Sequence, residues 1–346
     1  MHTITIETSR LSTHCWVSGP EAGTPVLLIH GNLTTGRFFQ SLAQHLDTRC
    51  RVVAPDLRGF GRSEPKPIDA TRGLRDWSDD LHALLEALGW TGQRRVHVGG
   101  WSIGGAVAQQ YEIDHREDVA TLTLFAPMSP FGFGGSRDAQ GTPCYADFAG
   151  SGGGTAAPDF VRRLAAGDAS ADEPASSPRI VMRSFFWSPR YQAPDEDELI
   201  SEVLLTRVGD EFYPGGTTSS ENWPGVAPAP AGVNNAISPR WCDTSAFGNQ
   251  QQPAPVLWIR GDEDQVVSNA SLFDFGTLGK LGAVPGWPGE DVFPSQPMLD
   301  QTRAIFERRQ ARGGSLREVV LHEVGHGPPV ERAAEVAELM LEHITQ

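Results

Sequence analysis

Short, mostly apolar runs alternate along the chain with longer segments whose apolar residues recur every three or four positions. The runs occupy positions 26–29, 51–54, 96–98 and 121–126, and each stops one or two residues before a Gly or Pro. Such runs, without strict alternation, are typical of strands covered on both faces. A spacing of three and four is typical of helices with one buried side. Their alternation predicts a parallel sheet with helices packed on both faces.

The clearest helical segment spans about residues 74–88 and is followed by Gly89, a residue type that commonly ends helices. A shorter apolar stripe over 38–46 predicts a second helix. The first 18 residues instead alternate apolar and polar positions, which predicts an antiparallel hairpin.

The sheet rhythm stops near residue 128, and residues 129–252 are rich in Gly, Pro and Ser. They contain helical fragments at about 179–187 and 195–208, and the second begins with an acidic run suited to the first turn of a helix. They also contain more aromatic residues than a linker needs. We therefore expect an inserted lid, whose aromatic side chains form either its own core or the wall of a pocket.

The rhythm resumes at 256–259, after which a second Gly- and Pro-rich loop interrupts it. We expect a core made of residues 1–128 and 253–346, with a lid inserted at 129–252 and a further loop insert at about 268–296. The elements expected after this loop are a helix over roughly 297–312, a strand over 316–321 and a final helix over about 329–344.

Charge restricts the partners of the chain. Its 346 residues hold 28 Lys and Arg against 43 Asp and Glu, a formal net charge of −15. Such a surface repels phosphate backbones, so we expect no nucleic-acid partner. No basic cluster suits an anionic membrane and no stretch approaches 18 apolar residues, so we expect no membrane partner either. The N-terminus has no basic stretch followed by an apolar run, so we expect a cytoplasmic protein.

Residues 100–104, Gly-Trp-Ser-Ile-Gly, match the pattern G-x-S-x-G. The pattern follows the strand predicted at 96–98 and opens an apolar helical segment. A serine on so tight a strand-to-helix turn is held in a strained conformation, with its hydroxyl above the sheet edge. The helix N-terminus also aims free N–H groups at negative charge that develops nearby. We interpret Ser102 as a nucleophile.

A serine hydroxyl needs a general base. His326 follows the last predicted strand and lies on a loop at its carboxyl end, where the catalytic groups of parallel sheets gather. The base in turn needs a carboxylate that fixes its tautomer. Asp262, Glu263 and Asp264 all follow the strand at 256–259, and spacing alone does not choose among them. The order serine, acid, histidine is that of a nucleophile-elbow enzyme.

Residues 322–326, His-Glu-Val-Gly-His, also match the zinc-protease pattern H-E-x-x-H, which requires both histidines on one helix face. A strand precedes them here, and Gly325, Gly327 and Pro328 prevent a continuing helix. On a strand the two histidines would lie about 13 Å apart, at roughly 3.3 Å per residue, too far for one zinc ion. No phosphate-binding G-K-[ST] pattern is present, so we expect neither a metal nor a cofactor. The four cysteines form no C-x-x-C pair, and we expect free, buried thiols at Cys15, Cys50, Cys144 and Cys242.

Together these motifs resemble the α/β-hydrolase superfamily. The run His30-Gly31-Asn32 is similar to the family's oxyanion turn, and residues 56–63 are similar to its D-x-R-G-x-G-x-S loop. Residues 100–104 are similar to its nucleophile elbow, and Gly325-His326 is similar to its base loop. The resemblance covers roughly 1–128 and 253–346. It implies an α/β fold with a mostly parallel, eight-stranded sheet, helices on both faces, and a lid inserted after the sixth strand.

The resemblance also implies the roles of particular residues. The acid loop of similar proteins reads G-x-x-D-x-x-V, which implies Asp264, with Asp262 as the alternative. Some relatives carry the acid after the sixth strand, where this chain has no carboxylate, and this favours Asp264. The backbone N–H groups of Asn32 and Ile103 would form the oxyanion hole. Residues that could line the substrate pocket are Leu33, Trp101, Phe131, Phe133, Phe186 and Trp187.

The implied function is hydrolysis of a carboxylic ester or lactone by a serine, through an acyl-enzyme intermediate. Two aromatic-rich inserts over the strand ends favour a small-molecule substrate that is hydrophobic and fairly bulky. Carbon–carbon bond hydrolases, amidases and perhydrolases use the same triad, and a slow ligand-sensing protein could use the same frame. The sequence does not separate these alternatives, and it leaves the oligomeric state open.

Overall fold

The computed structural model describes residues 1–46 and 48–345. Eight strands form a sheet in the order β1-β2-β4-β3-β5-β6-β11-β12. The pairs β1–β2 and β2–β4 are antiparallel, and the remaining neighbours are parallel. The predicted fold class and the N-terminal hairpin are therefore confirmed. The strands are β1 (His2–Glu7), β2 (Ser12–Ser18), β3 (Thr24–Ile29), β4 (Cys50–Pro55), β5 (Val96–Trp101), β6 (Val119–Phe125), β11 (Val256–Gly261) and β12 (Leu316–Leu321).

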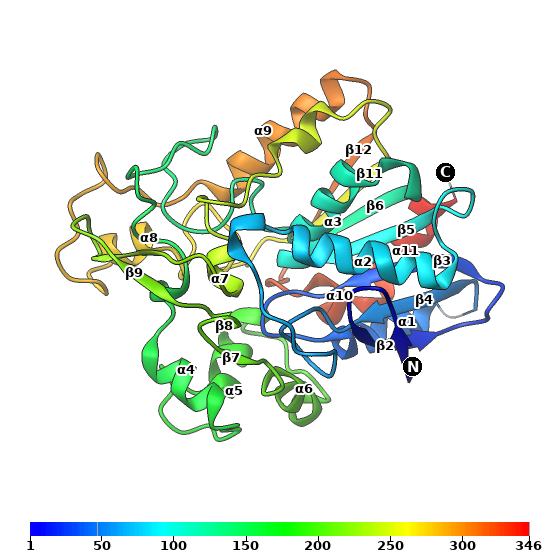
Figure 1. Ribbon diagram of the computed structural model, residues 1–346, viewed down its shortest axis with the longest axis horizontal. Coiled ribbons are helices and arrows are strands. Elements are labelled where there is room, and N and C mark those ends of the chain that lie inside the picture. The colour runs from blue at the N-terminus through cyan, green and yellow to red at the C-terminus, as the bar shows by residue number, and fades with distance from the viewer. Residues whose placement is uncertain (47, 346) are drawn as a thin grey trace.

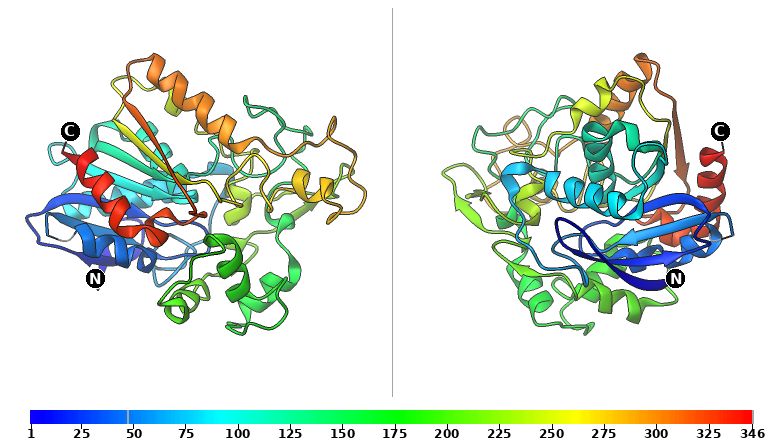
Figure 2. Two further views of the ribbon diagram at one scale, coloured as in Figure 1. Left: turned by 180° about the vertical axis from the view of Figure 1, so that it is seen from behind. Right: turned by 45° about the vertical axis from the view of Figure 1, so that its right-hand side comes forward.

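Helices cover both faces of this sheet (Figure 1). On one face lie α2 (Arg75–Leu88), α3 (Ile103–Asp114) and α9 (Met298–Ala311). On the other lie α1 (Gln40–Leu46) and α11 (Ala333–Ile344), which the view from behind brings forward (Figure 2). Helix α2 ends where the sequence predicts, because Gly89 adopts the left-handed conformation, with φ of 67°, that closes a helix.

Residues 129–252 leave the sheet after β6 and return to it at β11; we call them the long insert. Together with the short insert, residues 268–296, they gather at one end of the sheet (green to orange in Figure 1). A π-helical turn, Met182–Phe186, follows α5 in the long insert. The other elements of the two inserts are α4 (Pro158–Ala165), α5 (Pro178–Val181), α6 (Glu196–Val203), α7 (Val233–Ala236), α8 (Phe275–Lys280), β7 (Val208–Gly209), β8 (Tyr213–Pro214), β9 (Thr217–Ser219) and β10 (Val226–Pro228).

Three predicted elements differ from the structure, two of them in the inserts and one at the last helix. The helix expected over 195–208 ends at Val203, because Val208 pairs with Tyr213 as a short strand. The short insert, expected to be a loop, contains α8, whose first turn is capped by the Asp274 side chain accepting from the Thr277 backbone N–H at 3.2 Å. In the first case a short strand pairing, and in the second a side-chain cap, outweighs the pattern of apolar residues.

The final helix is also different from its prediction, since it is divided into α10 (Pro328–Glu331) and α11. The backbone leaves helical geometry at Arg332, with φ of −131°. The preceding residue, Glu331, turns its carboxylate toward the loop before α10, where it accepts several backbone hydrogen bonds. The Glu331 carboxylate, at the point where the two helices divide, therefore holds the loop that carries His326.

The four cysteines carry free thiols, three of them buried and Cys144 half-buried. Among the helices of the described residues, none has the length and apolar character needed to cross a bilayer.

One half-buried histidine near the start of β5 should make the fold sensitive to acid. His97 lies on β5, with its Nδ1 2.9 Å from the Thr121 hydroxyl. Burial, with a further contribution from His343, lowers the pKa of His97 to about 4. In the unfolded chain the ring takes up a proton near pH 6.5, whereas in the folded chain it stays neutral until near pH 4. The free energy of unfolding should therefore fall by about 2 kcal/mol as the pH drops from 7 to 4.5.

Urea unfolding at both pH values measures this loss. The variant His97→Asn, which keeps a polar group but does not titrate in this range, should lose less stability than the wild type over the same interval. An equal loss in both proteins would assign the acid sensitivity to other groups.

Candidate active site

Ser102 lies at the junction of β5 and α3, in a backbone conformation that L-residues rarely adopt. Its φ is 56° and its ψ is −117°. Backbone hydrogen bonds hold the turn, because Ser102 N–H donates to the Phe125 carbonyl and the Ser102 carbonyl accepts from Met128 N–H, both at 3.0 Å. Strain of this kind persists only where the surroundings enforce it. The sharp turn predicted from the G-x-S-x-G pattern is present.

The glycines of the pattern are required by close backbone approach. A Cβ added to Gly100 would collide with the carbonyl of Gly104, and one added to Gly104 would collide with the carbonyl of Ile29. Gly31 lies beside the nucleophile candidate, since its added Cβ would be 3.2 Å from the Ser102 Cβ. The turn after β3 therefore passes directly next to Ser102.

His326 and Asp264 form a buried pair. The Nδ1 atom of His326 lies 2.8 Å from Oδ2 of Asp264, and each side chain is 5% exposed. The other carboxylate oxygen of Asp264 accepts from the backbone N–H groups of Val266 at 2.8 Å and Val267 at 2.9 Å. With Nδ1 bonded to the carboxylate, Nε2 is the ring nitrogen left to exchange a proton. His326 and Ser102 line the same cavity.

The neighbouring acids have other partners. Asp262 lies 2.6 Å from Nδ1 of His322, whose side chain is 85% exposed. This hydrogen bond raises the pKa of His322. Glu263 accepts from the Ser188 hydroxyl at 2.7 Å. Of the three acids that spacing left open, the structure brings Asp264 to His326. Because β12 ends at Leu321, the H-E-x-x-H run lies in a loop, and its two histidines face different carboxylates.

The loop that carries His326 is held from two sides. The Trp101 indole N–H donates to the His326 carbonyl at 2.6 Å. The Glu331 carboxylate accepts from the backbone N–H groups of Gly325 at 2.9 Å, Gly327 at 3.2 Å and Ser188 at 2.8 Å. Burial raises the pKa of Glu331. Sequence reasoning missed Glu331, although an acid in the first turn after a Gly-rich loop is a pattern that could have indicated it.

The two residues expected to supply oxyanion donors also line the cavity. Ile103 is the first residue of α3, so its N–H has no acceptor within the helix. Asn32 follows β3 in the turn beside Ser102. That turn is fixed by His30, whose Nε2 accepts from the Leu57 backbone N–H at 2.8 Å. Burial lowers the pKa of His30, so its ring braces the turn in the neutral form.

The cavity has a volume of about 340 Å³ and reaches from the sheet edge into both inserts. None of the described residues that line it is Lys, Arg, Asp or Glu. Its wall is mostly aliphatic and aromatic, and it includes four of the six side chains expected to line a pocket, namely Leu33, Trp101, Phe133 and Phe186.

Trp187 and Phe131, the other two expected residues, lie outside this lining. Trp187 is buried behind it, stacked on Trp101 with ring centroids 6.2 Å apart, and its ring covers Gly327. Phe131 packs against Gly141 within the long insert. Trp187 thus supports the wall from behind, whereas Phe131 packs within the insert, a difference that the aromatic content of the insert could not reveal.

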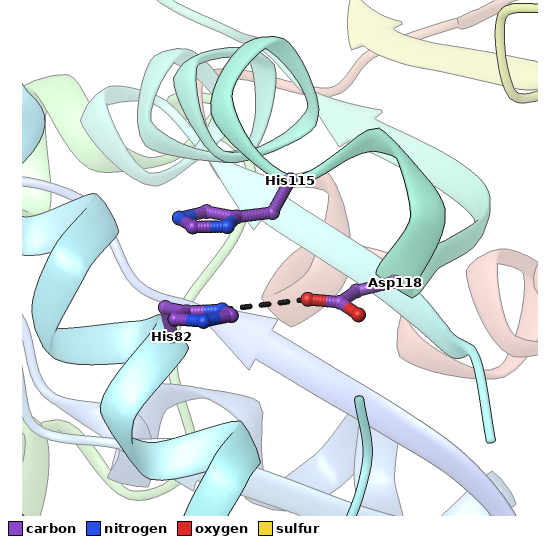
Figure 3. Close-up of side chains that lie close together, drawn as sticks. All are labelled: His82, His115 and Asp118. Carbon is purple, nitrogen blue, oxygen red and sulfur yellow. Dashed lines mark ion pairs between the residues drawn. The ribbon is translucent and has the colours of Figure 1, made fainter. Parts of the chain in front are cut away.

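A second cluster of titratable side chains lies apart from the cavity lining (Figure 3). His82 and His115 stack face to face, with ring centroids 3.8 Å apart and planes 6° from parallel, and His82 Nδ1 lies 3.4 Å from Asp118. Asp118 also accepts from the Tyr111 hydroxyl at 2.9 Å. Parallel rings direct their nitrogen lone pairs alongside one another, whereas a tetrahedral metal requires them to converge. Burial, and then the charge of His82, lowers the pKa of His115. The contacts of His82 with Tyr111 and Asp118 make the cluster a polar network between α2 and the end of α3.

The chain is similar to known proteins at two levels, a family profile that covers most of it and individual relatives that match a part of it. The sequence profile of the Alpha/beta hydrolase family matches residues 26–339. Lipase 1 of Psychrobacter immobilis is 38% identical over 107 residues, which are 31% of this chain and 32% of that protein. The cis-3-alkyl-4-alkyloxetan-2-one decarboxylase of Xanthomonas campestris is 34% identical over 113 residues, 31% of this chain and 37% of that protein. The chain thus matches about a third of the length of these curated relatives.

Among solved structures, an esterase from Exiguobacterium antarcticum superposes with a TM-score of 0.61. The superposition covers 100% of both chains at 17% sequence identity. At this identity the likeness establishes the fold.

Proposed function

This chain belongs to the alpha/beta hydrolase family, and from that premise we propose that it hydrolyses esters or lactones with a serine nucleophile. The observation that supports this proposal best is the convergence of three features on one cavity. They are the strained turn at Ser102, the buried His326–Asp264 pair, and the two backbone turns at Asn32 and Ile103.

In the proposed reaction, Nε2 of His326 takes the proton of Ser102 as its Oγ attacks the substrate carbonyl. The N–H groups of Asn32 and Ile103 stabilise the negative oxygen that results. Asp264 stabilises the imidazolium and holds the ring orientation. His326 then protonates the leaving alcohol, and a water molecule activated in the same way releases the acid and restores Ser102.

The lining of the cavity supports a hydrophobic and fairly bulky substrate. A volume of about 340 Å³ lies within the range of small-molecule sites. Burying a carboxylate or ammonium group without a partner is strongly unfavourable, and the described residues of the lining include no Lys, Arg, Asp or Glu that could pair with one. The relative from Xanthomonas campestris is named for an alkyl-substituted oxetan-2-one, which is a cyclic ester, and Lipase 1 is named as a lipase. In this proposal the long insert acts as the lid of the site.

A fluorophosphonate probe and a series of p-nitrophenyl esters test the proposal. The probe should label Ser102, as identified by peptide mass spectrometry. The kcat/KM should rise about fourfold for each methylene added to the acyl chain until the cavity is full, because each buried CH₂ contributes about 0.8 kcal/mol. Matched amides and ketones run alongside the esters identify the bond that is cleaved. Absence of both labelling and turnover would instead support a ligand-binding protein on the same frame.

A further inference from the structure

The apolar wall of the cavity contains one polar pair contributed by the long insert. Asn234 on α7 and Tyr213 on β8 both line the cavity. The Oδ1 atom of Asn234 is buried and has no hydrogen-bond partner within the described chain. A buried acceptor without a partner costs about 1–3 kcal/mol, so an unpaired acceptor on a residue that lines a cavity points to a role toward a ligand.

The pair is held rigidly. Val233 N–H donates to the Phe212 carbonyl at 2.8 Å, which ties α7 to the strand of Tyr213. The neighbouring Asn235 accepts from Gly153 N–H at 2.9 Å and donates to the Gly216 carbonyl at 2.8 Å. The Asn235 side chain therefore holds the backbone around α7 in place, whereas its neighbour Asn234 lines the cavity.

The phenol of Tyr213 remains protonated under ordinary conditions. Burial raises its pKa, and the neighbouring Asn234 side chain opposes this rise. The Tyr213 ring is fixed by an edge-on contact with Phe160, with ring centroids 6.4 Å apart. The pair therefore offers the cavity one donor, the Tyr213 O–H, and one acceptor, the unpaired Asn234 Oδ1.

We propose that Asn234 and Tyr213 form a subsite for a hydroxyl group of the substrate, so that the favoured esters or lactones are hydrophobic molecules that carry a hydroxyl. A hydroxyl both donates and accepts, as the pair requires. A ketone only accepts and leaves Asn234 Oδ1 unpaired, while a carboxylate would bring a charge without a counter-ion. The inference rests on the proposed ester hydrolysis, and it concerns the wall formed by the long insert, whereas Ser102 lies on the sheet edge.

Asn32 Oδ1 is a second buried acceptor without a partner in the lining. It belongs to the turn that carries a proposed oxyanion donor, so changes there would affect every substrate. Asn234 is therefore the position at which selectivity can be tested separately from catalysis.

The test compares p-nitrophenyl ω-hydroxyalkanoates with unsubstituted alkanoates of equal length, from four to ten carbons, as the ratio of their kcat/KM values. In the wild type the ratio should peak at the chain length that reaches the pair. Asn234→Leu, of the same branched shape, should lower the ratio at that length at least about tenfold, since the site no longer pairs the hydroxyl. Tyr213→Phe should lower it about threefold to tenfold. Methyl ketone esters of the same length should show no such peak.

Matched controls are Asn249→Leu, at an exposed position, and Tyr145→Phe, outside the lining, and both should keep the wild-type ratio. Fluorophosphonate labelling of each variant shows that its site is folded. A ratio that has no peak, or that Asn234→Leu and Tyr213→Phe leave unchanged, would show that water satisfies this pair and would overturn the subsite alone. A wild type that hydrolyses neither ester series would overturn the proposed function and the subsite with it.

Discussion

Replacement of Ser102 by alanine should lower ester turnover by roughly four to six orders of magnitude and leave the fold intact. The variant removes the only atom that the proposed mechanism uses at this residue, the hydroxyl oxygen. The turn itself should persist, because its hydrogen bonds to Phe125 and Met128 are made by the backbone. Alanine also carries a Cβ, so the strain at φ of 56° is the same in both proteins.

Steady-state hydrolysis of a p-nitrophenyl ester measures the loss, and circular dichroism with thermal unfolding checks the fold. Ser201→Ala, on an exposed face of α6, is a suitable control and should retain full turnover. If Ser102→Ala kept more than a few per cent of the wild-type rate, Ser102 would not be the nucleophile.

Asp264→Asn should lower kcat by roughly three to four orders of magnitude. The carboxylate accepts from His326 Nδ1 at 2.8 Å, so an amide in its place can present an N–H to that nitrogen and favour the wrong tautomer. The imidazolium formed during the reaction would also lose its counter-charge. The effect should therefore appear in kcat rather than in KM.

Asp262→Asn is the matched comparison, two positions away on the same loop. Its partner is the exposed His322, so turnover should stay within about threefold of the wild type, as expected for a surface ion pair. A large loss in Asp262→Asn together with a small one in Asp264→Asn would transfer the role of the acid to Asp262.

These two aspartates show where sequence reasoning stops. The pattern of apolar runs places the acid loop at the carboxyl end of β11, because that position follows from the sheet. It does not determine which of several neighbouring side chains turns toward the histidine. That choice depends on local backbone turns, here fixed by the bonds from Val266 and Val267 to Asp264.

The core of the fold was predictable for a related reason. Strands buried on both faces and helices with one buried side carry strong periodic patterns, and the tight turn at Ser102 requires glycines that can be read directly. The long insert has short elements fixed by contacts far apart in the sequence, such as the hydrogen bond from the Thr35 hydroxyl to Glu202 on α6 at 2.8 Å. Its contributions to the wall, Asn234 and Tyr213 among them, were therefore beyond a pattern analysis.

The contact between Trp187 and the glycines beside His326 has a consequence for engineering. A Cβ on Gly325 or Gly327 would collide with Trp187, so the segment around this residue forms the surface on which the histidine loop rests. A chimaera that receives a complete foreign insert should lose this surface and misplace His326, the proposed proton acceptor. A graft that retains residues 186–191 and exchanges the region around α7 and β8 should keep His326 in place and change the proposed hydroxyl subsite.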